Sequence, residues 1–201
     1  GAKGFDLDLV SEVMTYNASQ GKSAYAAIIN RLDRPVSGLV LIARNKSAAA
    51  KYSTLMQKEG GFNKQYEALI CGKLSEPKGT FVDYLKKDGI TNTSAIVPAD
   101  AAANDKDAKL SKLEYEVISY DEVKDITHVR IHLITGRHHQ IRVQFASRRH
   151  PLVGDYKYAT ADCGMDNAVK AVALKRNQIA LCAVSLTVDN KTYSVAPEFL
   201  L

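Results

Sequence analysis

The residues best suited to chemistry begin with Asp33, which lies between Arg31 and Arg34 in a cluster of charged side chains. The apolar run 39–43 follows and predicts a buried strand, with a bend over 35–38, where proline, serine and glycine favour a turn. Charged groups set against a buried strand cost free energy unless they are paired or functional. From these residues alone, Asp33 either pairs with a neighbouring arginine or is a reactive carboxylate.

A second cluster, residues 135–142, combines basic, imidazole and amide side chains. Thr135-Gly136 predicts a turn into a helix that begins near Thr135 or Arg137, on which His138 and Arg142 lie close together. The adjacent histidines could suggest a metal, but neighbouring side chains on a helix diverge and no further ligand cluster is near. We therefore expect no metal site. A solvated basic helix, or a hydrolase using the two histidines without a convincing nucleophile, are the alternatives.

Composition sets the frame for these clusters. The 201 residues, 46% of them apolar, predict one domain spanning 1–201, and the net charge of +5 suits a polyanionic partner without proving one. The three cysteines show no metal-type spacing and are expected to be reduced thiols of a cytoplasmic protein. No apolar run is long enough to span a bilayer, so no membrane association is expected.

The elements that must position the clusters follow from periodicity and turn residues. Helices are predicted over 5–17, over 47–58 with Ser47 as its N-cap, and over 168–175. Strands are predicted over 62–72, 80–85, 95–97, 109–120, 129–133, 179–188 and 193–197. The Ala/Asp-rich stretch 100–108 is expected to be a loop.

Four segments of the sequence resemble the RluA-type pseudouridine synthase family, which isomerises uridine in structured RNA. Residues 30–40 are similar to the family signature H-R-L-D-x-x-T-S-G-L-L, and 64–68 fit K-x-Y-x-A. Residues 133–142 match L-x-T-G-R-x-H-Q-I-R, and 151–158 match P-x-x-G-D-x-x-Y. Asn30 and Cys182 replace histidines of the family, and Val36 replaces threonine.

The resemblance implies roles for individual residues. Asp33 would be the catalytic carboxylate, Tyr66 would lie against the uracil and accept the C5 proton, and Arg142 would hold Asp33 in a two-pronged contact that favours its ionised form. Arg31 would fill the space left by a flipped nucleotide. Implied RNA contacts come from Arg34, Lys64, Arg137, His139 and Gln140, with Arg148 and Arg149 as further phosphate ligands.

The resemblance also implies the architecture and the activity. We expect an α+β fold with a mixed, mainly antiparallel central sheet in two halves, flanked by helices, with a catalytic cleft between the halves. The reaction would isomerise uridines of rRNA or tRNA without a cofactor, and the protein would be a monomer. The family's N-terminal strand with a Lys-Pro-Gly-like motif has no counterpart here, so we expect it to be missing or divergent. The alternative is an RNA-binding or chaperone protein that kept the fold and lost turnover.

Overall fold

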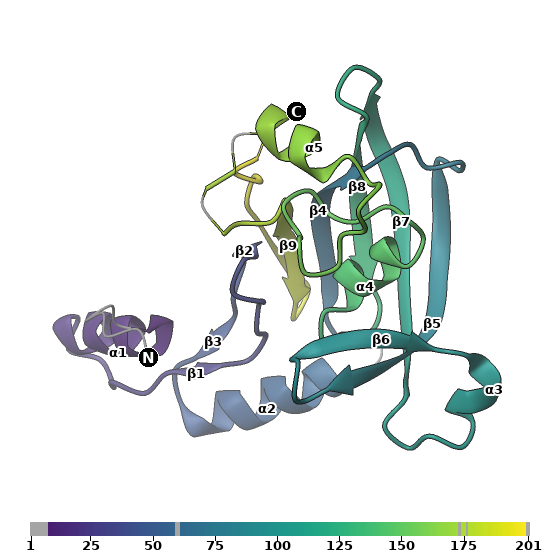
Figure 1. The fold of residues 1–201 in the computed structure, drawn as a ribbon. Helices are drawn as coiled ribbons and strands as arrows, with labels where there is room; N and C mark the ends of the chain where they lie inside the picture. Colours follow the sequence, from purple (N-terminus) through teal and green to yellow (C-terminus); the bar gives the residue numbers. More distant parts are fainter. Residues whose placement is uncertain (1–7, 59–60, 173, 176, 200–201) are drawn as a thin grey trace. The chain divides into compact units, whose positions relative to one another are not determined.

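The computed structural model describes residues 8–58, 61–172, 174–175 and 177–199 (Figure 1). The chain forms two compact units. The first unit comprises residues 1–32 and 40–62, and the second comprises residues 33–39 and 63–201. The short segment 33–39, which contains the first cluster's aspartate, therefore belongs with the large C-terminal unit. Each unit is described by itself.

The first unit contains two helices and a two-stranded antiparallel sheet. Its elements are α1 (Leu9–Ser19), β1 (Ala27–Ile28), β3 (Ile42–Ala43) and α2 (Lys46–Gln57). Helix α1 begins after Asp8, whose carboxylate accepts a hydrogen bond from the Ser11 amide; residues 5–7 of the predicted helix lie outside the described residues. Helix α2 starts earlier than predicted because Asn45, and not Ser47, is its N-cap, accepting from the Ala48 amide at 2.7 Å.

The prediction of one buried strand over 39–43 is wrong. Leu39 donates its amide to Ala183 in the second unit, whereas Leu41 accepts from Ile29 in the first. The amide of Leu41 is bound by the side chain of Asn30 at 2.6 Å, so a side chain takes the place of a strand partner. Because the run changes units after residue 39, it cannot continue as a single strand.

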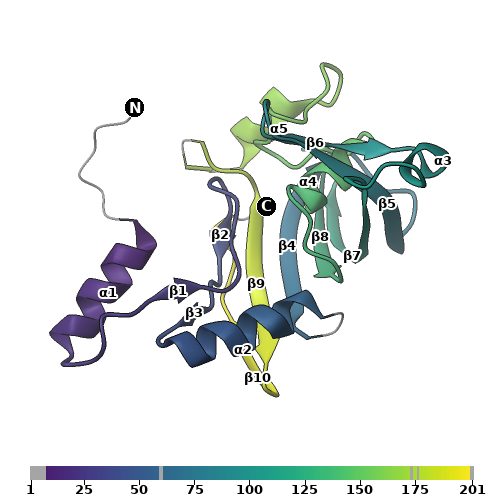
Figure 2. The same ribbon diagram turned by 90° about the horizontal axis from the view of Figure 1, so that it is seen from below.

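Over its described residues, the second unit is built on an eight-stranded sheet (Figure 2). Its strands are β2 (Ser37–Gly38), β4 (Asn63–Cys71), β5 (Lys78–Asp88), β6 (Thr93–Val97), β7 (Lys109–Asp121), β8 (Ile126–Leu133), β9 (Leu181–Val188) and β10 (Lys191–Ser194). The order is β10-β9-β4-β8-β7-β5-β6, and β2 joins β9. All pairs are antiparallel except β2 with β9. The predicted α+β class with a mainly antiparallel sheet is confirmed; the two halves and the cleft stay predictions.

Three short helices accompany this sheet: α3 (Ala99–Ala102), α4 (Gln140–Ala146) and α5 (Met165–Ala171). The prediction of a loop over 100–108 is wrong at its start, where Ala99–Ala102 form α3. Helix α4 begins at Gln140, later than predicted. Helix α4 is almost wholly buried, and its Phe145 packs edge-on against Phe81 of β5, with ring centroids 5.1 Å apart. Helix α5 contributes Met165 and Ala168 to an apolar cluster over β4 and β9. Residues 140–142 of the second charged cluster belong to α4, and this buried helix packs on the sheet through Phe145.

Candidate active site

Asp33 is held at the edge of the sheet by the segment that follows it. Its carbonyl accepts from the Val36 amide at 2.9 Å, which closes a turn, and Ser37 and Gly38 then pair in parallel with β9. Gly38 has φ +118°, and a Cβ there would lie 2.4 Å from the Ala183 carbonyl oxygen, so only glycine allows this close approach. The Asp33 side chain remains 29% exposed. The turn thus presents a carboxylate accessible to a ligand.

Arg142 of α4 brings the two clusters together. Its guanidinium is 5% exposed, and Nη1 donates to Asp33 Oδ2 at 3.2 Å. The same guanidinium donates from Nε and Nη2 to the two oxygens of buried Asp155, at 2.7 and 2.8 Å. Burial alone would lower the pKa of Arg142, but the hydrogen bonds and charges of Asp155 and Asp33 raise it. The predicted partner of Asp33 is correct, but the two-pronged contact is made with Asp155, and Asp33 receives a single hydrogen bond.

His139 approaches the same carboxylate oxygen. It is the N-cap of α4 and has a left-handed backbone, φ +54°, a conformation that histidine adopts more readily than most residues. Its Nε2 lies 3.6 Å from Asp33 Oδ2, and its Nδ1 lies 2.6 Å from the hydroxyl of Tyr158. Burial, followed by the charge of Arg142, lowers the pKa of His139 to about 4. The imidazole beside Asp33 is therefore neutral at neutral pH.

His138 faces a different partner. Its Nδ1 lies 2.8 Å from Ser94 Oγ, while that hydroxyl donates to the His138 carbonyl at 2.9 Å. The hydroxyl therefore has two contacts with the same residue, and the tautomer of His138 decides which atom donates in the contact with Nδ1. Ser94 is only 6% exposed. This geometry speaks against the hydrolase alternative, because the hydroxyl nearest the histidine pair is buried and is also bound to a carbonyl.

Tyr66 lies in the middle of β4, where the predicted alternation places it. It is 8% exposed, and burial, then the charge of Asp33 and then that of Cys182, raise its pKa to about 12. The phenol therefore keeps its proton at neutral pH. Tyr66 and Asp33 are close enough for this electrostatic coupling, so the two residues predicted to act on the nucleotide share one environment.

Two residues predicted to contact RNA are occupied within the protein. Gln140 is 3% exposed; its Oε1 accepts from Thr135 Oγ1 and its Nε2 donates to the carbonyl of Lys112. Arg148 forms two hydrogen bonds with Asp83, at 3.0 and 3.1 Å. These contacts favour a structural role for both side chains, because each already has the partners that a phosphate or base would offer.

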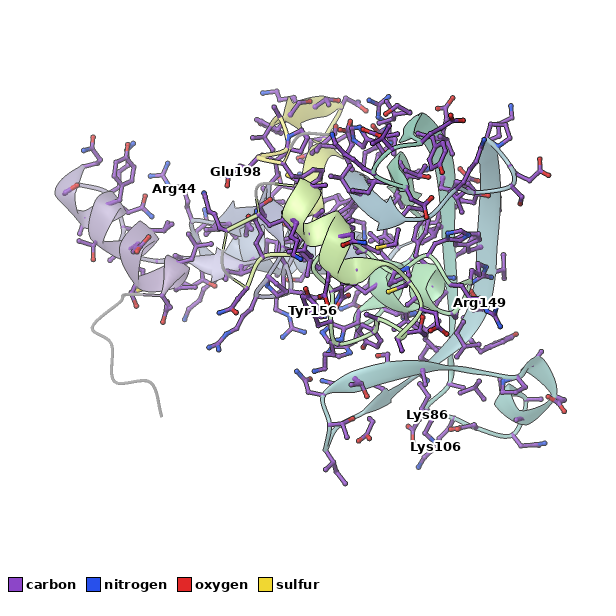
Figure 3. The ribbon with its side chains drawn as sticks, turned by 45° about the horizontal axis from the view of Figure 1, so that its top comes forward. Arg44, Lys86, Lys106, Arg149, Tyr156 and Glu198 are labelled. Carbon is purple, nitrogen blue, oxygen red and sulfur yellow. The ribbon has the colours of Figure 1, made fainter. Side chains whose placement is uncertain are left out.

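The other predicted cations differ in exposure. Arg34 and Arg137 are exposed, as is Arg149, which Figure 3 shows at the surface. Lys64 is half-buried next to Gly136, and burial lowers its pKa. Arg31 is exposed in the first unit. The accessible cations of the second unit thus come from both sequence clusters.

Sequence reasoning missed the roles of Asp155 and Tyr158. Both lie in the segment 151–158, which matches P-x-x-G-D-x-x-Y, and both contact side chains of the second cluster. Ser94, whose amide donates to Tyr158 at 2.9 Å, carried no sequence signal at all. The Gly-Asp-x-x-Tyr spacing was the one available indication.

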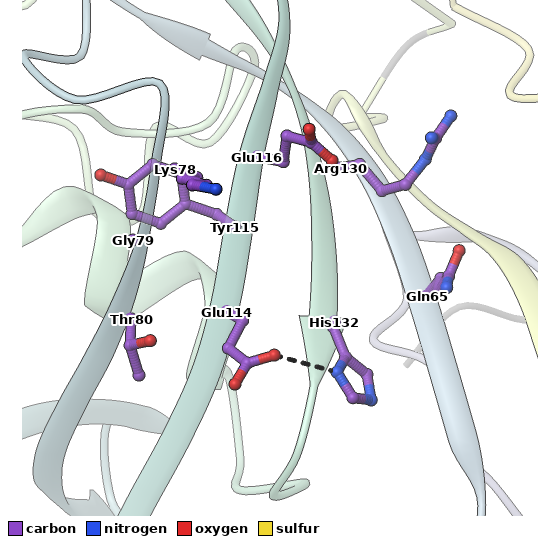
Figure 4. Close-up of a pocket in the computed structure, with 9 residues that line it drawn as sticks. All are labelled: Gln65, Lys78, Gly79, Thr80, Glu114, Tyr115, Glu116, Arg130 and His132. Carbon is purple, nitrogen blue, oxygen red and sulfur yellow. Dashed lines mark hydrogen bonds and ion pairs between the residues drawn. The ribbon is translucent and has the colours of Figure 1, made fainter.

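A pocket on the sheet lies apart from these residues (Figure 4). Gln65, Arg130 and His132 line it, and His132 is paired with Glu114 at 3.3 Å. Since strand side chains alternate, Gln65 points to the opposite face of the sheet from Tyr66.

Among the described residues, no group of histidine, cysteine and acidic side chains could hold a metal ion, and none of the helices has the length and apolarity to cross a membrane.

Comparison with known proteins decides the family. The family model described as RNA pseudouridylate synthase matches residues 4–147, more than half of the chain. The chain belongs to the RNA pseudouridylate synthase family. The match includes both Asp33 and Arg142, so the contact between the two clusters lies within the family region.

Two relatives illustrate how far the synthase similarity extends. The chain is 36% identical over 138 residues to the ribosomal large subunit pseudouridine synthase D of Blochmanniella floridana, covering 68% of this chain and 39% of that protein. It is 31% identical over 131 residues to an uncharacterized RNA pseudouridine synthase of Aquifex aeolicus (strain VF5), covering 65% and 39%. The chain thus spans about two fifths of the length of these two relatives.

Solved structures of the family share the fold. The human RNA pseudouridylate synthase domain containing 4 superposes with a TM-score of 0.73 at 17% identity, covering 94% of this chain and 78% of that one. The human RNA pseudouridylate synthase domain containing 1 gives a TM-score of 0.67 at 23% identity, covering 87% and 69%. The family resemblance drawn from the motifs is therefore confirmed.

Proposed function

We propose that this protein is an RNA pseudouridine synthase that isomerises uridines in structured RNA, with Asp33 as the catalytic carboxylate. The observation that carries the proposal is the hydrogen bond from Arg142 Nη1 to Asp33 Oδ2, which joins two motifs far apart in sequence. An accessible carboxylate fixed by a guanidinium can act as a nucleophile or as a base toward the sugar. The reaction detaches uracil from C1′, rotates it and rejoins it through C5, and needs no redox step or cofactor.

Tyr66 is the second reacting residue in this proposal. Its side chain stacks on the flipped uracil, and unstacking the nucleotide costs a few kcal/mol that pocket contacts recover. Because its pKa is raised to about 12, Tyr66 begins as a phenol. It can accept the C5 proton only after transferring its own proton to another group. In its phenol form it stacks and donates a hydrogen bond.

RNA binding would rest on exposed cations. His139, predicted to contact RNA, is buried with its two nitrogens facing Tyr158 and Asp33, so its part in the proposal is to hold Asp33 rather than a phosphate. Arg34 and Arg137 are available to phosphates, Lys64 is held closer to the sheet, and Arg31 enters the space of the flipped base. Each phosphate contact should appear in the salt dependence of binding. Large-subunit rRNA is the favoured substrate because relatives at 36% and 33% identity are named for it. A tRNA substrate, a cytoplasmic location, a monomeric state and a single catalytic domain over 1–201 remain part of the proposal.

The binding-only alternative drew its weight from Asn30, Cys182 and the missing N-terminal motif. Asn30 is buried and binds the Leu41 amide, and Cys182 is 1% exposed in β9. Both replacements of histidine therefore sit in structural positions.

The test uses bulk RNA from cells that lack this protein. The RNA is incubated with wild type or with Asp33→Ala, treated with the pseudouridine-specific carbodiimide reagent, and mapped by reverse-transcription stops. New stops with wild type alone, together with retained RNA binding by Asp33→Ala, support the proposal and name the uridine. No new stops with either protein, with salt-dependent RNA binding by both, would favour the binding-only alternative, and equal new stops with both would show that Asp33 is not the catalytic carboxylate.

A further inference from the structure

Tyr158 lies at the centre of a chain of contacts that ends at Asp33. The backbone amide of Ser94 in β6 donates to Tyr158 Oη at 2.9 Å. Tyr158 Oη lies 2.6 Å from His139 Nδ1, and His139 Nε2 lies 3.6 Å from Asp33 Oδ2. All four residues belong to the second unit.

The direction of each proton follows from the donor inventory. An amide can only donate, so Tyr158 Oη accepts from Ser94 and has its own proton to give. The nearest acceptor recorded for that proton is His139 Nδ1. Burial lowers the pKa of His139, so its ring carries one proton at neutral pH. If Nδ1 accepts, that proton must sit on Nε2, the nitrogen that faces Asp33.

We propose that Tyr158 is a positioning residue that fixes the Nε2–H tautomer of His139 and, through it, the orientation of the Asp33 carboxylate. The inference rests on the proposed function. Both contacts of the carboxylate, from Arg142 Nη1 and His139 Nε2, are to Oδ2. Among the described residues, Oδ1 has no recorded partner. Oδ1 is therefore the oxygen presented to the nucleotide, and Oδ2 is the oxygen that the protein holds.

The charges around His139 agree with a neutral, oriented ring. Arg142 and Lys157 oppose its protonation, the neighbouring His138 ring also does so, and Asp33 favours it. The His138 ring stacks on it with centroids 3.8 Å apart, which limits ring rotation. Tyr158 contacts Nδ1 and Nε2 faces Asp33, so each ring nitrogen of His139 has one neighbouring group that selects its protonation. In the opposite tautomer, two lone pairs, one from Nε2 and one from Oδ2, would face each other.

A purely structural role for Tyr158 would act through its ring, which lies 5.1 Å from the Arg142 guanidinium. Tyr158→Phe keeps that ring and removes only the hydroxyl, so it separates packing from proton placement. The matched control is Tyr156→Phe, two residues away, whose hydroxyl binds Asp166 and whose side chain is 60% exposed (Figure 3).

The deciding measurement is the tautomer of His139 in the intact protein. Long-range ¹H–¹⁵N correlation spectra of histidine-labelled protein at pH 7 distinguish a proton on Nδ1 from one on Nε2, and the chain has only five histidines. We expect Nε2–H in wild type and in Tyr156→Phe, and a mixture of tautomers in Tyr158→Phe. Nδ1–H in wild type would overturn the proposal even if no variant folds, and so would an unchanged tautomer in Tyr158→Phe.

Kinetics on the substrate RNA test the second part of the proposal, that the tautomer of His139 orients Asp33 for catalysis. We expect Tyr158→Phe to lower kcat about tenfold with little change in KM, the size of effect expected when a positioned group loses its orientation. An altered tautomer with unchanged kcat would overturn the positioning role. If wild type isomerises no uridine, the proposed function fails and the link to catalysis fails with it. The tautomer result does not depend on activity, so the two failures are distinguishable.

Discussion

Arg142 and Asp155 form a bidentate pair in which both side chains are buried, with exposures of 5% and 1%. The fork of the guanidinium matches the two carboxylate oxygens, which makes the pair both strong and directional. Asp155 therefore fixes the plane of the guanidinium, and only the remaining Nη1 reaches Asp33. Arg142 is thus oriented by the protein before any RNA binds, which is the arrangement that favours catalysis.

Asp155→Asn removes the countercharge from this pair. We expect a loss of about 3–5 kcal/mol in the free energy of unfolding, because a buried arginine is left with a single, partly exposed carboxylate partner. Urea unfolding at pH 7 measures the change. Asp166→Asn is the control, since the carboxylate of Asp166 accepts a hydrogen bond from the exposed hydroxyl of Tyr156. A difference of less than about 1 kcal/mol between the two variants would show that Asp155 does not anchor Arg142.

Arg142→Lys keeps the charge but cannot donate to Asp155 and Asp33 in the same fixed geometry. We expect kcat to fall by about 100-fold or more, because Arg142 orients the reacting carboxylate. RNA binding should change little, because the buried guanidinium is not accessible to phosphates. Single-turnover kinetics and filter binding separate the two effects. Arg130→Lys, at an exposed pair with Glu67, should retain activity. Full activity of Arg142→Lys would mean that charge alone suffices.

The sequence was informative where local signals and tertiary structure agree. Alternation located β4, β7 and β9 to within a few residues, and the family resemblance implied Arg142 as the partner of Asp33. It failed where a long-range contact decides the outcome. The run 39–43 reads as a strand, yet an asparagine side chain and two different sheets divide it. The partners of Tyr158 come from β6 and α4, a juxtaposition that no periodicity encodes.

His139 should make stability depend on pH. Its pKa is about 4 in the folded protein, below the ordinary 6.5, so the unfolded chain binds more protons between these values. The free energy of unfolding therefore falls as pH decreases from about 6.5 to 4, by at most about 3 kcal/mol from this residue. Comparing urea unfolding at pH 7 and pH 4.5, His139→Gln should lose less stability than wild type. If His139→Gln loses as much stability as wild type over this range, the assignment is refuted.

Gly38→Ala tests how Asp33 is seated. The positive φ and the 2.4 Å approach to the Ala183 carbonyl both exclude a side chain, so we expect a loss of about 3 kcal/mol or more. The same change should lower kcat by displacing Asp33. Thermal unfolding and the RNA assay report the two effects. At Gly89 a Cβ would meet nothing within 4 Å, so Gly89→Ala should leave both unchanged. Near-wild-type behaviour of Gly38→Ala would mean that β2 can move away from β9 without cost.

The parallel pairing of residues 37–38 with β9 has a consequence for the protein during synthesis. Asp33 is translated well before Arg142 and before Cys182 and Ala183 of β9, with which residues 37 and 38 pair. Contacts of such high sequence separation form slowly and late. A chain that ends before β9 therefore carries the carboxylate without its seat, and the site stays unassembled until β9 has been translated.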